Sequence, residues 1–287
     1  MRTIPVRHIA ASQRTSAQAG LFTIRDVRQV LNGTDLAHGL HKHDFFFILA
    51  LQKGKGSHEI DFIPYKIQDH SIFIIRPGQV HRLELKAGST GFLLEFDRSF
   101  YQPKSTITEQ RWQKASSKNY CVVDAAPFMK LSSILNNLSN EFITKQDGYI
   151  EAIKAHLDIF FIEYIRQSRH PGRVEKAENP YIQERFEELV HLLEQHICSR
   201  KNVAQYAELL NLSSYQLNAI TKASVGKTVS ALINEQILLE AKRYLLATPN
   251  QIKDLADHLG YEDASYFIRF FKKHTGHSPE AFRKNFK

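Results

Sequence analysis

Residues 255–279 of the chain read LADHLGYEDASYFIRFFKKHTGHSP. Apolar residues recur at helical spacing before and after Gly260, which predicts one short helix over residues 251–259 and a second over residues 264–273. Gly260 suits the left-handed conformation that ends a helix, and Asp263 can cap the start of the next one. Two helices joined by so short a turn form a helix-turn-helix unit, whose second helix can enter the major groove of DNA.

A second copy of this pattern lies roughly 50 residues earlier in the chain. The matched pairs are Ala207 and Ala256, Leu210 and Leu259, Leu217 and Phe267, Ile220 and Phe270, Lys222 and Lys272, and Gly226 and Gly276. The repeat predicts helices over residues 203–210 and 214–222, with Ser213 and Gln216 as a capping box at the start of the second. An apolar segment, residues 229–246, predicts a connecting helix about 27 Å long, comparable to the roughly 34 Å between successive major-groove openings.

The second helix of each unit should bury its apolar side chains and present amide, hydroxyl and cationic groups to bases and phosphates. The outward residues that we expect to bind DNA are Tyr215, Gln216, Asn218 and Lys222 in the first unit, and Ser265, Ile268, Arg269, Lys272 and Lys273 in the second. The alternative is a plain helical bundle in which these are solvated surface positions.

The same stretch resembles the signature of AraC/XylS-type bacterial transcription regulators. Its A-x-x-x-G-Y, S-Y-F-x-R-x-F-K-K and G-x-x-P elements all occur within residues 256–279, and the resemblance extends over residues 181–287. It implies that exposed residues of both second helices read bases, which by position are Tyr215, Asn218, Ser265, Ile268 and Arg269. The first unit departs from the family pattern, because Ala219 stands where a basic residue is frequent and Thr221 where an aromatic is common.

The first half of the chain has a different pattern. Between residues 22 and 96, short apolar runs are separated by turn sequences such as Asn32-Gly33 and Pro77-Gly78, which predicts a small antiparallel β-barrel or sandwich. Two amphipathic helices should follow it. We therefore expect an α+β protein of two domains: a cupin-like β-barrel with following helices over residues 1–168, a polar linker over residues 169–180, and an all-α domain with two helix-turn-helix units over residues 181–287.

Histidines stand out in the predicted barrel. The imidazoles of His41 and His43 project to one face of a strand, and His81 from a neighbouring strand could join them. This spacing resembles the two short motifs of cupin barrels and the sensor half of many AraC-type regulators. Phe47 and Ile48 stand where a metal-binding cupin normally has a carboxylate, so we expect no metal and no cofactor.

The favoured role for these histidines is hydrogen bonding to a small-molecule effector in an apolar pocket. Phe45 and Phe47 would form its walls if they face inward, which depends on the strand register. Ordinary structural histidines, or a metal site, are the alternatives left open.

The 287-residue chain is 43% apolar and 24% charged, which is typical of a folded globular protein. No apolar run approaches the about 20 residues of a membrane span, and the N-terminus lacks an export signal, so we expect a cytoplasmic protein with no membrane partner. Cys121 and Cys198 form no CxxC pair, which argues against a disulfide framework. The net charge of +8 permits a nucleic acid partner, and six Lys and Arg face only Glu280 within residues 264–287.

These observations favour a DNA-binding transcription regulator, expected to be a ligand-responsive activator that binds double-stranded DNA and works with RNA polymerase. We expect a homodimer formed through an apolar stripe on one predicted helix. The alternative is that this stripe packs within the same chain, against the predicted helix of residues 131–142. The stripe consists of Ile150, Ile153, Leu157, Phe161 and Tyr164. The sequence carries no GxSxG nucleophile motif and no P-loop, so enzymatic activity has no positive support. A metal-dependent cupin enzyme with a DNA-targeting module is the rival interpretation, and a constitutive DNA-binding protein whose barrel only dimerises is a third.

Overall fold

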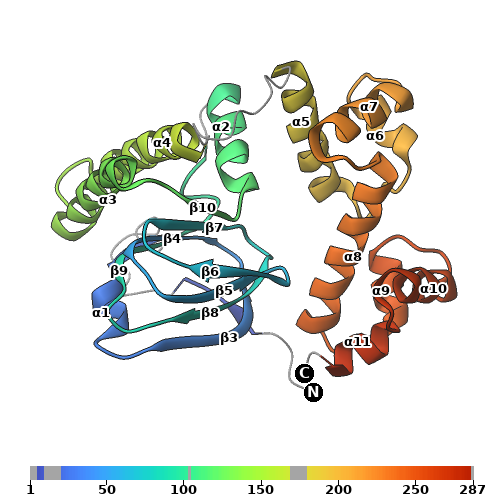
Figure 1. Ribbon diagram of the computed structural model, residues 1–287, viewed down its shortest axis with the longest axis horizontal. Helices are drawn as coiled ribbons and strands as arrows, with labels where there is room; N and C mark the ends of the chain where they lie inside the picture. The colour runs from blue at the N-terminus through green and yellow to red at the C-terminus, as the bar shows by residue number, and fades with distance from the viewer. Residues whose placement is uncertain (1–4, 10–20, 103–104, 169–179, 286–287) are drawn as a thin grey trace. The chain divides into compact units, whose positions relative to one another are not determined.

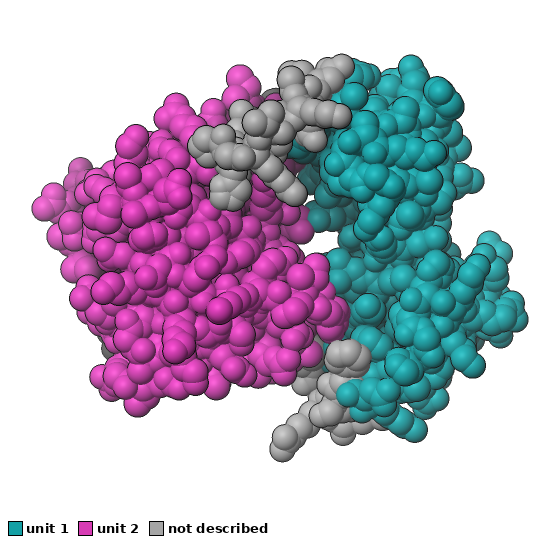
Figure 2. Space-filling view, viewed as in Figure 1, with its two compact units in different colours: residues 1–4, 172–287 teal, residues 5–171 magenta. Residues whose placement is uncertain are grey.

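The computed structural model describes residues 5–9, 21–102, 105–168 and 180–285. The chain divides into two compact units, which Figure 2 colours separately. Residues 5–171 form one, here called the β unit, and residues 172–287 belong to the other, here called the helical unit. Residues 169–179 of the predicted linker lie outside the described residues, and Pro180 begins a helix.

Two five-stranded sheets form the core of the β unit (Figure 1). In spatial order, the first sheet contains β1 (Val6–Arg7), β3 (Leu36–His43), β8 (Val80–Leu85), β5 (Gly56–Ile60) and β6 (Ile63–Ile67). The second contains β10 (Tyr120–Val122), β7 (Ser71–Ile75), β4 (Phe46–Lys53), β9 (Thr90–Phe96) and β2 (Phe22–Asp26). Among the described strands, all pairs are antiparallel except β1 with β3. The inward side chains of both sheets form one apolar core. The arrangement is a β-sandwich, which confirms the predicted β-rich first domain.

Strand β4 is buried on both faces, which explains its continuous apolar sequence. Phe47 and Leu49 point into the core between the sheets, while Phe46 and Ile48 point into a second core formed with the helices of this unit. The register question is therefore answered: Phe45 and Phe47 face inward. Figure 1 shows helices beside the second sheet, and their buried side chains complete that second core.

The helices of the β unit are α1 (Val27–Leu31), α2 (Thr106–Ser117), α3 (Ala125–Thr144) and α4 (Tyr149–Ser168). The last two were predicted from their apolar period. Helix α2 was missed because its sequence, TITEQRWQKASS, is mostly polar and offers little periodicity. It is held by one large buried side chain, Trp112, whose ring meets those of Phe46 and Phe161 at 4.6 and 4.5 Å.

The helical unit contains seven helices among its described residues, and they confirm the predicted duplication. They are α5 (Pro180–His196), α6 (Val203–Leu209), α7 (Ser214–Val225), α8 (Val229–Ala247), α9 (Ile252–His258), α10 (Ala264–Thr275) and α11 (Pro279–Asn285). The pairs α6–α7 and α9–α10 are the two helix-turn-helix units, and α8 connects them and contacts both (Figure 1). Gly260 has a φ of +68°, and a Cβ there would lie 2.4 Å from the backbone oxygen of Cys198. Both the turn conformation and the close approach therefore require glycine.

Candidate DNA-binding surface and histidine cluster

Helix α10 presents a polar and basic face to solvent. Asp263 caps its first turn by accepting a hydrogen bond from the Ser265 amide at 2.7 Å, as predicted. Phe267 and Phe271 are fully buried and hold the opposite face of the helix against its unit. The five residues expected to point outward are all exposed: Ser265, Ile268, Arg269, Lys272 and Lys273. A capped helix with an anchored apolar face and a cationic outer face is suited to lie in a major groove.

Helix α7 offers a less basic outer face. Ser213 and Gln216 form the predicted capping box, so the Gln216 side-chain oxygen is engaged by the Ser213 amide at 2.9 Å. Tyr215 is 84% exposed and Lys222 is also exposed. These side chains are free to reach a nucleic acid, whereas Leu217 and others on the inner face are buried.

Asn218 corrects the prediction for α7. Its side chain is half-buried and bound at both ends of the amide. The Nδ2 group donates to the Ser214 carbonyl at 2.9 Å, and Oδ1 accepts from the Val229 amide, the first of α8, at 3.1 Å. The expectation that this side chain points outward is wrong, because the start of α8 needs an acceptor for its backbone N–H.

Four histidines meet inside the β unit, on the inner face of the first sheet. His41 and His43 lie on β3, His81 lies opposite His41 on β8, and His58 lies on β5. Each of the four is at most 4% exposed. The Nε2 atoms of His81 and His43 are 3.3 Å apart, and His58 Nε2 lies 2.9 Å from His81 Nδ1. The structure therefore brings together the three predicted histidines.

His58 was missed by sequence reasoning. The available signal was its spacing of two residues from Ile60, which places both side chains on the inner face of one strand. Together the four side chains, called here the histidine cluster, consist of His41, His43, His58 and His81.

The histidine cluster is neutral at pH 7. Burial lowers the pKa of His41 to about 4 and the pKa values of His43 and His58 to about 3, and it holds the pKa of His81 well below its usual value. Arg7 adds to the effect at three of these rings, since its positive charge disfavours a second cation nearby. Neutral imidazoles keep one nitrogen lone pair each, for a hydrogen bond or a ligand.

Aromatic walls enclose the cluster on one side. The ring of Phe45 stacks on His43 at 4.3 Å, and the ring of Phe47 lies 5.4 Å from it. Both residues were predicted to line this site, and both are buried beside it.

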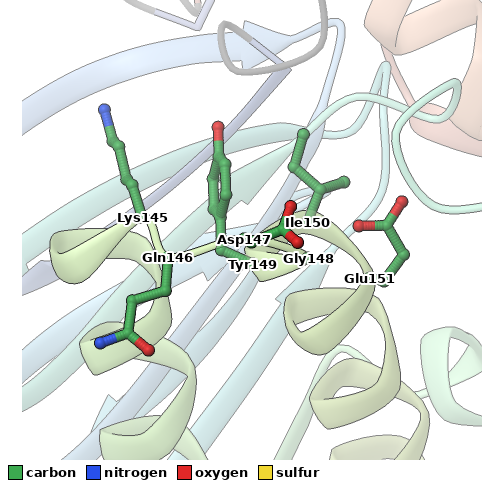
Figure 3. Close-up of a pocket in the computed structure, with 7 residues that line it drawn as sticks. All are labelled: Lys145, Gln146, Asp147, Gly148, Tyr149, Ile150 and Glu151. Carbon is green, nitrogen blue, oxygen red and sulfur yellow. The ribbon is translucent and has the colours of Figure 1, made fainter.

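An open pocket lies elsewhere in the β unit, at the turn between α3 and α4 (Figure 3). Its lining comes from the single continuous stretch of residues 145–151. Polar groups from different elements do not converge there, as they do in most binding sites, and we assign it no ligand.

The apolar stripe on α4 is used inside the β unit. Ile153, Leu157, Phe161 and Tyr164 are each at most 1% exposed, and Ile150 packs partly buried against the same core. The prediction that this stripe forms a dimer interface is therefore wrong, because α2, α3 and the second sheet already cover it.

Among the described helices, none combines the length and apolar character that crossing a bilayer requires.

Comparison with known families matches both units. Residues 27–114 match the model of the AraC-like ligand binding domain, and residues 206–285 match that of a helix-turn-helix domain. The chain therefore carries the two domains of an AraC-type regulator, an AraC-like ligand binding domain and a helix-turn-helix domain. The second match begins inside α6 and ends with α11, so it spans both helix-turn-helix units.

Proteins named as transcriptional activators match along most of the chain. The HTH-type transcriptional activator RhaR of Yersinia pestis is 23% identical over 86% of this chain and 84% of its own length. The HTH-type transcriptional activator RhaS of Pectobacterium atrosepticum is 26% identical over 85% of this chain and 86% of its own. Among solved structures, ToxT of Vibrio cholerae is 15% identical and covers 95% of this chain and 97% of its own, with a TM-score of 0.41.

Proposed function

We propose that the protein is a sequence-specific DNA-binding regulator that activates transcription in response to an effector bound in its β unit. The observation that carries this proposal is the pair of capped helices, α7 and α10, at matching positions of two helix-turn-helix units, each with an exposed polar face. The relatives named as transcriptional activators support the direction of regulation.

The DNA contacts divide by side-chain chemistry. Arg269 can make paired hydrogen bonds to a guanine, and Ile268 can pack on a thymine methyl group. Lys272 and Lys273 at the end of α10, and Lys222 on α7, are suited to phosphates. The remaining proposed contacts, all polar and on the exposed starts of the two helices, are Tyr215, Gln216 and Ser265.

Arg269→Ala tests the base-reading role of α10. The variant should lose roughly 1 to 3 kcal/mol of binding free energy and relax base preference at one position, because a paired contact to one guanine is removed. Selection of bound sequences from a random DNA pool, repeated for both proteins at one salt concentration, measures both effects.

Lys272→Ala is the matched control, because it removes one charge from the same helix. It should weaken binding to all sequences alike. The slope of log affinity against log salt concentration should become shallower by about one, because one fewer counterion is released. If Arg269→Ala kept both its affinity and its base preference, α10 would not be a recognition helix.

The β unit supplies the regulatory part of the proposal. We place the effector at the histidine cluster, with His41, His43 and His81 as its polar groups and Phe45 and Phe47 beside them. A homodimer would present two helical units to paired half-sites, and activation implies contact with RNA polymerase in the cytoplasm. We propose no enzymatic reaction, since the function of a regulator requires none.

A further inference from the structure

The histidine cluster has the arrangement of a metal site. One ring nitrogen from each of His41, His43 and His81 can be chosen so that all three atoms lie within 4.8 Å of one another. The 3.3 Å between the Nε2 atoms of His43 and His81 is the separation of two ligands in a tetrahedral site, where bonds of about 2.0 to 2.1 Å place neighbouring nitrogens about 3.4 Å apart.

His41 has one nitrogen committed to the protein and one unused. Its Nδ1 lies 2.7 Å from the Gly39 carbonyl oxygen, which can only accept, so Nδ1 carries the proton. Its Nε2 therefore carries no proton and has a free lone pair. That atom is buried and has no hydrogen-bond partner among the residues that the structure describes. A histidine binds a metal ion through such an unprotonated nitrogen, and here that nitrogen lies close to two other imidazoles.

His58 completes the pattern from outside the three ligands. Metal-binding histidines commonly donate their second ring N–H to a neighbouring acceptor, which fixes the ring and raises its basicity. The Gly39 carbonyl oxygen accepts this hydrogen bond from His41. The Nε2 atom of His58, 2.9 Å from His81 Nδ1, can accept it from His81.

The packing around the cluster favours an ion over an organic molecule. Ring centroids of His41 and His81 are 4.2 Å apart, those of His41 and His43 are 4.8 Å apart, and Phe45 stacks directly on His43. An ion can enter between the nitrogens with small side-chain shifts, whereas an organic effector would have to separate the rings. Arg7, which donates to His38 next to this group at 3.0 Å, opposes a cation and should limit the affinity.

We propose that His41, His43 and His81 bind a divalent transition-metal ion of the kind that prefers nitrogen ligands, with His58 orienting His81. Three neutral imidazoles suit zinc, copper or nickel better than magnesium, calcium or manganese. A three-histidine site also leaves a coordination position open for water or a further ligand. The role of this ion as the effector rests on the proposed function above, while the site itself does not.

The first measurement uses the full chain stripped with chelator and dialysed. Elemental analysis after incubation with Zn²⁺ should find one ion per chain, and Co²⁺ should give the visible absorption of a tetrahedral nitrogen-ligated site. Both should raise the temperature of unfolding, while Mg²⁺ should not. Less than one tightly held ion per chain with Zn²⁺, Co²⁺ and Ni²⁺ would overturn the proposal.

Variants then locate the ion. Substituting His41→Gln with His43→Gln should abolish the Co²⁺ spectrum, and His58→Phe should weaken affinity by about 10- to 100-fold while the three ligands remain. His156→Gln is the matched control, since this half-buried histidine lies on α4 of the same unit and should leave the spectrum unchanged. Circular dichroism shows which variants fold. Metal uptake by the unaltered chain is measured without any variant, so the proposal can be refuted even if a variant fails to fold.

DNA binding by the metal-free and metal-loaded chain separates this inference from the proposed function. Sequence-specific, Arg269-dependent DNA binding without any metal uptake would refute the metal site and leave the proposed regulatory function standing. Metal uptake without sequence-specific binding would keep the site and refute the regulator. A change of DNA affinity on adding Zn²⁺ that the double variant lacks is the result expected if both hold.

Discussion

Asn218 joins two helices through one side-chain amide. Its oxygen accepts the first backbone N–H of α8, and its nitrogen donates to a carbonyl of α7. Asn218→Ala should therefore lower the free energy of unfolding of the helical unit by about 1 to 3 kcal/mol, because the Val229 amide loses its acceptor at a half-buried position. Urea denaturation followed by helical circular dichroism measures the loss.

Tyr215→Ala is the control on the same helix. Its side chain is 84% exposed, so stability should stay the same while DNA affinity falls. The interpretation of Asn218 as a positioning residue fails if its variant keeps the stability of the unaltered chain and loses only base preference.

Side chains that bond to another helix, as Asn218 does, are difficult to predict from sequence. The capping box of Ser213 and Gln216 was predictable because both partners lie within one turn. The partner of Asn218 is the amide of Val229, in the next helix, and its position depends on how α7 and α8 pack. Helical spacing alone placed Asn218 on the outer face, where a base contact was the natural expectation.

Helix α4 shows the same limit at the scale of an element. Its apolar period predicted the helix, but the period does not state what covers the stripe. The cover comes from α3, from the second sheet and from α2, whose polar sequence gave no signal of its own. The apolar stripe that suggested a dimer faces neighbours in the same unit, and one of them, α2, was not predicted.

Phe161→Ala tests this packing. The ring is 1% exposed and meets Trp112 at 4.5 Å and Tyr101 at 5.6 Å. Its removal should destabilise the β unit by about 3 to 5 kcal/mol through lost burial and a cavity. Thermal unfolding measures the effect, and Ile159→Ala on the exposed side of the same helix should change it little. A Phe161→Ala chain with unchanged stability and a smaller sedimentation mass would restore the stripe as a dimer interface.

At the scale of the whole molecule, each unit buries its own core. The β unit closes around the two cores on either side of its second sheet. The helical unit closes around side chains such as Leu193, Tyr206, Ile237 and Phe271, all from residues after 180. The polar segment of residues 169–180, with Pro171, Gly172 and Pro180, made this division predictable. The convergence of His58 with the other histidines was not, because it depends on the pairing of three strands.

The division predicts that residues 180–287 fold and bind DNA without the β unit. All eight proposed DNA contacts and α8, which spaces the two recognition helices, lie within this segment. For DNA with one binding site, the segment and the full chain should show the same dissociation constant at equal salt, since the same contacts form. For DNA with two sites, a dimeric full chain should bind more tightly by about 10²- to 10⁴-fold, because its second contact is made within one assembly. Fluorescence anisotropy with labelled one-site and two-site duplexes measures both, and the segment with Arg269→Ala serves as the control for specific binding. A folded segment that loses single-site affinity would place part of the DNA contact in the β unit and contradict this assignment.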